Sequence, residues 1–260
     1  MTWIEAVALL AAGVAAGTIN TLVGSGTLIT FPTLLAFGYP PLMANVSNNI
    51  GMVPGGVSGT LGYRSELEGQ GRWVRLLAPM SLVGAVTGAV LLLVLPEKAF
   101  ATIVPVLLGI SVVLVIVQPR LQRTLARRHE EQGRDHHDMS GGRTAATVGG
   151  TFGAGIYGGY FGAAQGVLLV GLLGSLLPAS LQQVNAIKNL LALIVNSVAA
   201  VIFLLVAHEH INWAVVGVIA LGTLVGGVVG SRVGRRLPPI VLRGVIVVVG
   251  LVAIVRLVAS

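Results

Sequence analysis

The chain has 260 residues, of which 55% are hydrophobic and 10% are charged, with a net charge of +7 and no cysteine. A soluble domain is usually about one quarter charged, so this composition excludes an ordinary soluble protein and predicts a polytopic protein whose partner is the lipid bilayer. The lack of cysteine excludes disulfides and thiolate metal sites. The basic residues gather in loops beside apolar runs, as the positive-inside rule describes, so we expect no nucleic-acid partner.

The chain divides into ten apolar segments, and most of them approach the roughly 20 residues that cross a bilayer as a helix. They are residues 3–23, 24–37, 42–62, 73–95, 99–118, 144–163, 164–178, 182–205, 212–231 and 239–259. The second and seventh segments are short, so each is expected to pair with its predecessor as a broken or re-entrant hairpin. The predicted fold class is therefore all-α.

A single long hydrophilic stretch, Gln118–Arg143, separates two halves of similar size. Pro119 is expected to stop the preceding helix, and the rest predicts a short surface helix and a flexible linker. His136 and His137 could bind a metal, but a solvated linker is the preferred interpretation, so we expect no metal and no cofactor. The predicted organisation is a first transmembrane repeat (1–118), a cytoplasmic linker (119–143) and a second transmembrane repeat (144–260).

Lysine and arginine concentrate in three loops, at residues 63–75, 118–143 and 232–238. An even number of crossings separates these loops, so they are expected to lie on one side of the membrane. The positive-inside rule identifies that side as the cytoplasm and puts both termini outside. Because Met1 and Thr2 lead directly into the first apolar run, no removable signal peptide is expected.

The second half of the chain repeats the pattern of the first at a shift of about 140 residues. Matching positions are Gly26 with Gly166, Asn45 with Asn185, Asn49 with Asn189, and Trp73 with Trp213. Each half has three crossings plus a hairpin, and this odd count inverts the second copy. The sequence therefore predicts two inverted-topology repeats of about five helical segments each, an architecture in which transporters bind substrate near the midplane.

The stretch Gly17–Gly62 is apolar but broken by glycines and prolines, and it carries many uncharged hydrogen-bonding side chains. Non-helical backbone is tolerated in a membrane only where it is buried in protein or lines a cavity. Broken helices also expose backbone N–H groups that attract anions. The candidate substrate-binding residues of the two halves are Asn20, Gly24, Ser25, Gly26, Thr27, Asn45, Ser47, Asn48, Asn49, Gln165, Gly166, Asn185, Lys188 and Asn189. The alternative is that the polar side chains tie helices together, which is the preferred role for Asn196.

Lys188 is the one formal charge expected near the working depth of a membrane segment. Every acidic residue lies in a loop or near a terminus. An intramembrane charge is costly and by default functional, so an unpaired cation in a polar pocket indicates a small anionic substrate. The alternative is that Lys188 lies near the cytoplasmic end of its helix and extends to the lipid headgroups.

No His, Cys or acidic residue lies inside a span to act as a general base, so we expect no enzyme. Glycines at every fourth position from Gly222 to Gly234 permit close helix packing. Packing within the chain is preferred, and a homodimer seam is the alternative.

Four segments and the glycine-rich opening of each half resemble the TauE/SafE family of membrane permeases, the sulfite exporters. The segments are Gly26–Pro32, Ala44–Asn48, Asn185–Asn189 with Asn196 and Phe203, and Gly222–Pro238. The resemblance implies two repeats, a bacterial inner membrane, and transport of small sulfur-containing anions such as sulfite, sulfonates or sulfoacetate. We therefore predict a secondary transporter that works by alternating access. The alternatives are a passive anion channel, a membrane-embedded enzyme, or a membrane subunit that binds a soluble partner through the linker.

Overall fold

The computed structural model describes residues 1–131, 140–232, 244 and 247–248. These residues form nine α-helices and two short 3-10 helices and contain no β-strand, which confirms the all-helical fold class. The α-helices are α1 (Trp3–Leu22), α2 (Thr27–Ala36), α3 (Pro41–Gly62), α4 (Gly71–Val94), α5 (Glu97–Glu131), α6 (Gly141–Tyr160), α7 (Gln165–Leu176), α8 (Leu181–Val206) and α9 (Trp213–Arg232). The 3-10 helices are η1 (Arg64–Leu67) and η2 (His208–His210).

Five of these helices are long and apolar enough to cross a membrane: α1, α4, α8, α9 and the first 24 residues of α5. The expected apolar segments agree with the observed helices to within a few residues for the first nine of the ten, except at the end of the fifth, where α5 continues beyond residue 118 to Glu131. The tenth, residues 239–259, falls almost wholly outside the described residues. The described part of the chain is therefore a multi-pass helical membrane protein.

The expectation that Pro119 ends a helix is wrong, because α5 continues through Pro105 and Pro119 to Glu131. Proline removes one backbone hydrogen bond, but membrane helices accept it where neighbouring groups compensate. Next to Pro119, the Gln118 side chain is fully buried and its amide nitrogen donates to the carbonyl oxygen of Val23 at 3.2 Å. This contact fixes the helix at the proline. The candidate metal ligands His136 and His137 lie outside the described residues.

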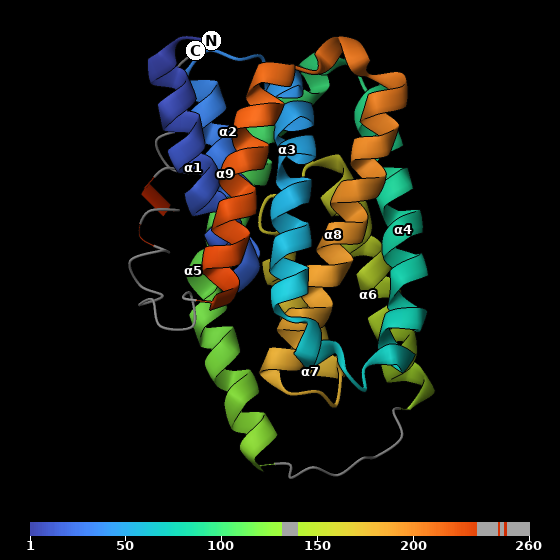
Figure 1. Ribbon diagram of the computed structural model, residues 1–260. Coiled ribbons are helices and arrows are strands. Elements are labelled where there is room, and N and C mark those ends of the chain that lie inside the picture. The colour runs from blue at the N-terminus through green and yellow to red at the C-terminus, as the bar shows by residue number, and fades with distance from the viewer. Residues whose placement is uncertain (132–139, 233–243, 245–246, 249–260) are drawn as a thin grey trace.

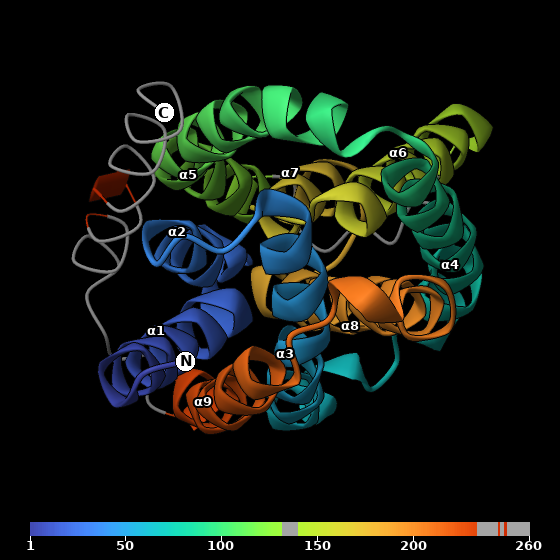
Figure 2. The same cartoon turned by 90° about the horizontal axis from the view of Figure 1, so that it is seen from above.

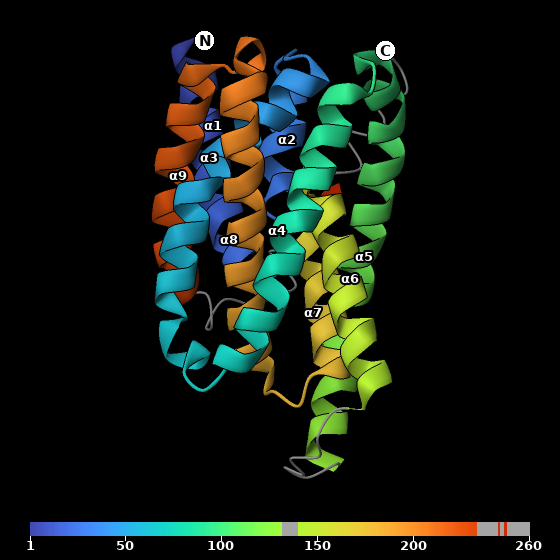
Figure 3. The same ribbon diagram turned by 90° about the vertical axis from the view of Figure 1, so that its right-hand side faces the viewer.

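The helix ends gather at two opposite ends of the molecule (Figures 1 and 3). The N-terminal end holds the start of α1, the α2–α3 connection, the α4–α5 turn and η2. The linker end holds η1, the end of α5, the start of α6 and the α7–α8 connection. The described arginines of the first two basic loops therefore lie toward one end. In the third loop, Arg232 closes α9 and the remaining arginines lie outside the described residues.

Glycines allow three helix pairs to pack with their backbones close together: α1 against α9, α3 against α9, and α4 against α6 (Figure 2). A Cβ added to Gly226 of α9 would lie 2.2 Å from the carbonyl oxygen of Val14, and one added to Gly88 of α4 would lie 2.1 Å from that of Ile156. Neither position accepts a side chain without moving backbone. The small-residue stripe of α9 is thus used for packing within the chain, as expected from the sequence.

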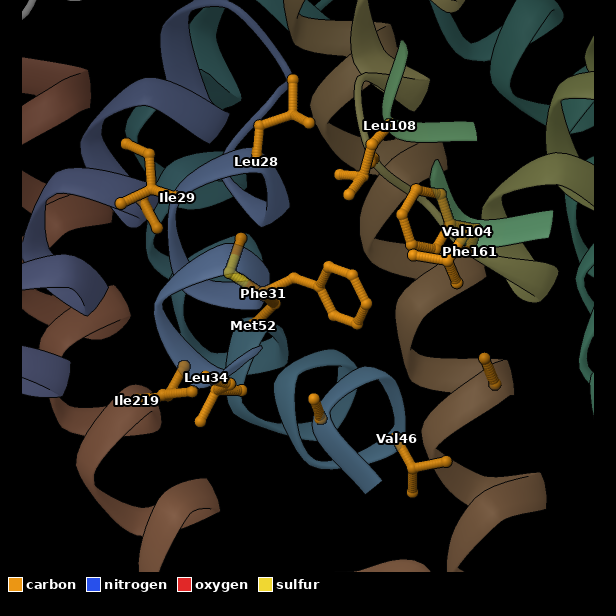
Figure 4. Close-up of a cluster of buried hydrophobic side chains, with 14 of the residues drawn as sticks. Leu28, Ile29, Phe31, Leu34, Val46, Met52, Val104, Leu108, Phe161 and Ile219 are labelled. Atoms are coloured by element: carbon orange, nitrogen blue, oxygen red, sulfur yellow. The ribbon is translucent and has the colours of Figure 1, made fainter. Parts of the chain in front are cut away.

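The largest apolar cluster among the described residues includes most of the buried side chains of α2 (Figure 4). Phe31 of α2 packs edge to face on Phe161, with ring centroids 5.3 Å apart. Phe100 of α5 meets Phe161 at 6.3 Å and Tyr160 at 5.7 Å. Edge-to-face pairs stabilise beyond their buried area, so these rings fix the position of the residues that follow α6.

Candidate functional site

The turn between α1 and α2, called here the first tip, consists of residues 23–26. The amide nitrogens of Val23 and Gly24 both donate to the carbonyl oxygen of Ile19, at 2.7 and 3.1 Å. Gly24 has a φ of +84°, which turns the chain sharply back. The Oδ1 atom of Asn20 accepts from the amide nitrogen of Gly26 at 3.4 Å, so this predicted site residue holds the turn closed.

The turn between α6 and α7, called here the second tip, consists of residues 161–164 and has the same backbone pattern. The amide nitrogens of Phe161 and Gly162 both donate to the carbonyl oxygen of Tyr157, at 2.9 and 3.0 Å. Gly162 has a φ of +78° and Ala164 a φ of +59°. The second tip thus reproduces the first about 140 residues later, as the sequence comparison of the two halves predicted.

The first tip is in direct contact with the first turn of α7, which directly follows the second tip. The amide nitrogen of Gly166 donates to the carbonyl oxygen of Gly24 at 3.0 Å. A Cβ added to either glycine would lie 2.4 Å from the Cα of the other, so only glycine fits at both positions. The α1–α2 pair starts from the N-terminal end and the α6–α7 pair from the linker end (Figures 1 and 3). The contact therefore joins two helix pairs that approach from opposite directions.

Lys188 of α8 reaches the first tip. Its Nζ atom donates to the carbonyl oxygens of Asn20 and Thr21, each at 3.1 Å, and the residue is 0% exposed. The neighbouring Asn189 donates from Nδ2 to the same Thr21 oxygen at 3.2 Å. No carboxylate pairs with Lys188 in the described chain. The alternative that Lys188 extends to the headgroups is therefore wrong, because the partly negative C-terminal end of α1 holds it inside.

Several buried side-chain atoms near the helix breaks have no hydrogen-bond partner among the described residues. Those of the predicted site residues are Ser25 Oγ, Asn49 Oδ1, Gln165 Nε2 and Asn185 Oδ1. Leaving a buried polar group unpaired costs about 1–3 kcal/mol, so an unpaired buried group is expected to have a functional role such as binding. Ser25 belongs to the first tip and Gln165 directly follows the second, so these two unpaired atoms belong to the segments that meet.

Two of the predicted site residues on α3 hold the hairpins in place. Asn45 donates from Nδ2 to the carbonyl oxygen of Tyr160 at 3.1 Å, at the end of α6. Asn48 lies between two hydroxyls of α2: its Nδ2 atom donates to Thr27 at 3.4 Å, and its Oδ1 atom accepts from Thr30. Asn45 thus contacts the second hairpin and Asn48 the first.

Two other predicted residues of α3 bond to elements outside the tips. Asn49 donates to Asn196 of α8 at 3.3 Å, which confirms the helix-linking role predicted for Asn196. The hydroxyl of Ser47 accepts from the backbone nitrogen of Asn212 at 2.9 Å, in the connection that leads into α9. In this conformation both side chains join helices.

Three further residues at the tips were missed in the sequence analysis. Gln118 of α5 donates to Val23 in the first tip. Ser111 of α5 donates to the carbonyl oxygen of Ala163 in the second tip at 3.1 Å, and the hydroxyl of Tyr157 donates to the same oxygen. Ser111 lies in an apolar run and Tyr157 in a glycine-rich run. Their polar hydroxyl groups are the only signal in the sequence that could have identified them.

The fold and these buried polar contacts define the class of protein as a multi-pass helical membrane protein with a polar centre. The profile of the family described as "Sulfite exporter TauE/SafE" matches residues 9–257, and the chain belongs to this family.

Among curated proteins, the chain is similar to the "Probable membrane transporter protein YfcA" of Escherichia coli, with 26% identity over 93% of this chain and 85% of that protein. It is also similar to the "Probable membrane transporter protein ORF9" of a Sinorhizobium species, with 35% identity over 38% of each chain. No solved structure matches the chain significantly. The family and these relatives identify a membrane transporter.

Proposed function

We propose that this protein is a secondary transporter of small sulfur-containing anions, such as sulfite, a sulfonate or sulfoacetate, and that it binds them where the two tips meet. One observation carries the proposal: helix pairs from opposite ends of the molecule meet at Gly24 and Gly166, beside a fully buried lysine. The proposed site consists of the fourteen residues named in the sequence analysis, of which Lys188, Ser25 and Gln165 are central.

The chemistry of this region suits an oxyanion. Lys188 supplies a positive charge with three N–H donors, and backbone oxygens accept two of them. Gln165 has an unpaired buried amide nitrogen, which is another donor. The first turns of α2 and α7 add helix N-termini, whose free N–H groups favour anions. The relation to a sulfite exporter family favours a sulfur oxyanion among the possible small anions.

The proposed mechanism is alternating access between two inverted repeats. Packing partners exchange between the halves: α1 packs on α9 as α6 packs on α4, and both α3 and α8 lie centrally. The glycines that make these contacts also correspond. Gly17 of α1 contacts α9 as Gly155 of α6 contacts α4, and these two glycines are separated by the same 138 residues as Gly24 and Gly162. Two copies related in this way can exchange conformations, which opens a central site first to one side of the membrane and then to the other.

For the orientation, we propose that the linker end faces the cytoplasm of a bacterial inner membrane. Most of the described arginines lie toward that end, so the positive-inside rule supports this assignment. The N-terminus is then outside. A reporter fused before Trp3 or inserted at residue 135 would test the orientation, because the proposal requires opposite compartments for the two.

The experiment that tests the function is transport by the purified chain reconstituted in vesicles. Sulfite, taurine, sulfoacetate, sulfate, acetate and chloride are compared for uptake, with and without an imposed gradient. Accumulation of a sulfur anion against its gradient supports the proposal. Flux that only equilibrates the anion indicates a channel, and lack of flux with every sulfur anion contradicts the proposed substrate class. Activity of the purified chain alone would also argue against a required soluble partner.

A further inference from the structure

The end of α1 presents backbone carbonyl oxygens of the kind that coordinate a monovalent cation. The backbone nitrogen that would normally pair with the carbonyl oxygen of Asn20 belongs to Gly24, and it bonds to Ile19 instead. The carbonyl oxygens of Asn20 and Thr21 are thereby left to side chains. Carbonyl oxygens at the end of a broken helix carry partial negative charge and coordinate Na⁺ in secondary transporters.

The group in contact with these oxygens is itself a cation. Lys188 is fully buried, and within the described residues no carboxylate neutralises it. A buried charge is normally paired with an opposite charge. Here the ammonium of Lys188 donates to neutral carbonyl oxygens. Carbonyl oxygens are also ligands of bound Na⁺.

Gly166 of α7 leaves room for the Lys188 side chain to reach the end of α1. A Cβ added to Gly166 would lie 2.8 Å from the Cδ atom of Lys188, so the lysine stem passes directly over this glycine. Asn189, one residue further along α8, shares the Thr21 oxygen with the ammonium. The Asn189 amide nitrogen donates to this oxygen, so Asn189 holds the Thr21 carbonyl in place beside the ammonium and is not itself a cation ligand.

We propose that the carbonyl oxygens of Asn20 and Thr21, the second of them held in place by Asn189, form a monovalent-cation site that the ammonium of Lys188 occupies as a built-in cation. Removing the side chain converts this position into a site for free Na⁺. For the transport cycle, which rests on the proposed function, the consequence is that the wild-type protein keeps its central positive charge without a bound Na⁺ and transports its anion without requiring Na⁺.

The test compares the Lys188→Ala variant with the wild type and with Lys98→Ala, which removes the only other lysine of the chain, at an exposed position. Each protein is extracted and purified in NaCl or in choline chloride of equal ionic strength, and its thermal unfolding is measured as a function of Na⁺, Li⁺ and K⁺. Ligand that binds only the folded state raises the melting temperature, by about 3–6 °C at about ten times Kd for a chain of this size.

The expected result is a saturable, Na⁺-selective rise for Lys188→Ala and no cation-selective change for the other two proteins. A folded Lys188→Ala variant without any selective rise would overturn the proposal. So would a variant that is lost in both salts, because Na⁺ would then fail to replace the ammonium. Binding of radioactive Na⁺ by the same preparations gives a second readout. These measurements need no transported substrate, so they remain informative if the sulfur anions prove wrong.

Discussion

The two tips share one backbone design and differ in charge. Each begins with two amide nitrogens on a single carbonyl oxygen, and each contains a glycine in the left-handed region, Gly24 or Gly162. The first tip is capped by the ammonium of Lys188. The second is capped by neutral groups, among them Asn45 and Ser111. The two turns therefore share a backbone pattern, while the side chains that contact them differ.

The two halves differ in charge at one pair of corresponding positions. Asn48 corresponds to Lys188 at the shift of 140 residues between the halves. Asn48 bonds to Thr27 and does not cap a tip. A single substitution at corresponding sites thus separates a residue that links two helices from one that brings charge to the centre. Under the proposed alternating-access mechanism, this asymmetry gives the two states different electrostatics.

The largest expected effect comes from disrupting the contact between the tips. Gly24→Ala places a Cβ 2.4 Å from the Cα of Gly166 and also puts alanine at a φ of +84°. The left-handed conformation costs a non-glycine residue about 1–2 kcal/mol, and overpacking adds about 1–3 kcal/mol. We expect strongly reduced yield of folded protein and a melting temperature far below that of the wild type.

Gly38→Ala is the matched control for this prediction. Gly38 has the same φ of +84° but nothing within 4 Å of an added Cβ. This variant therefore measures only the free-energy cost of placing alanine in the left-handed conformation. Gly162→Ala is expected to lie between the two, because its nearest contact is 3.0 Å away. Equal losses for Gly24→Ala and Gly38→Ala would show that the contact between the tips contributes nothing to stability.

The next effect concerns transport. Lys188→Ala removes the charge at the end of α1, and we expect sulfur-anion uptake measured without Na⁺ to fall by at least about tenfold, the loss of about 1.4 kcal/mol of transition-state stabilisation. Asn48→Ala, at the corresponding position, is expected to lower stability more than uptake per folded molecule. Uptake in vesicles, normalised to correctly inserted protein, separates the two. Full uptake by Lys188→Ala would eliminate the anion-binding role.

The helices could be predicted from sequence because apolar length, glycine and proline mark them locally. The short helices α2 and α7 were predicted from the shortness of the second and seventh apolar segments, whereas the re-entrant hairpins and the inverted repeat stay predictions. Pro119 was misjudged because a membrane helix tolerates proline where its surroundings compensate for the lost hydrogen bond, and those surroundings are distant in sequence. Local rules do not contain that information.

The site was predictable only in part, for a related reason. Lys188 is conspicuous as a charge in an apolar run, yet nothing local indicates that its partners are backbone oxygens 167 and 168 residues away. Ser111 is one hydroxyl in a long apolar helix, and the sequence does not show which neighbour it faces. Ser47 and Asn49 look like binding residues by type, but in this structure their hydrogen bonds join helices.

The smallest effects should appear where α5 touches the two tips. Gln118→Leu removes the amide that caps Val23, and the loss of such a bond costs about 1 kcal/mol. Ser111→Ala is expected to cost about half as much, because the hydroxyl of Tyr157 still donates to the carbonyl oxygen of Ala163. Thermal unfolding of both variants measures the difference.

The double variant Ser111→Ala with Tyr157→Phe sharpens the comparison. It leaves the Ala163 oxygen without either hydroxyl donor, and the combined loss should exceed the sum of the single losses because the two hydroxyls share one acceptor. The same coupling is not expected between Gln118→Leu and Ser111→Ala, which act on different tips. Coupling between those two would mean that the tips unfold as one unit, and that the Gly24–Gly166 contact transmits strain between the halves.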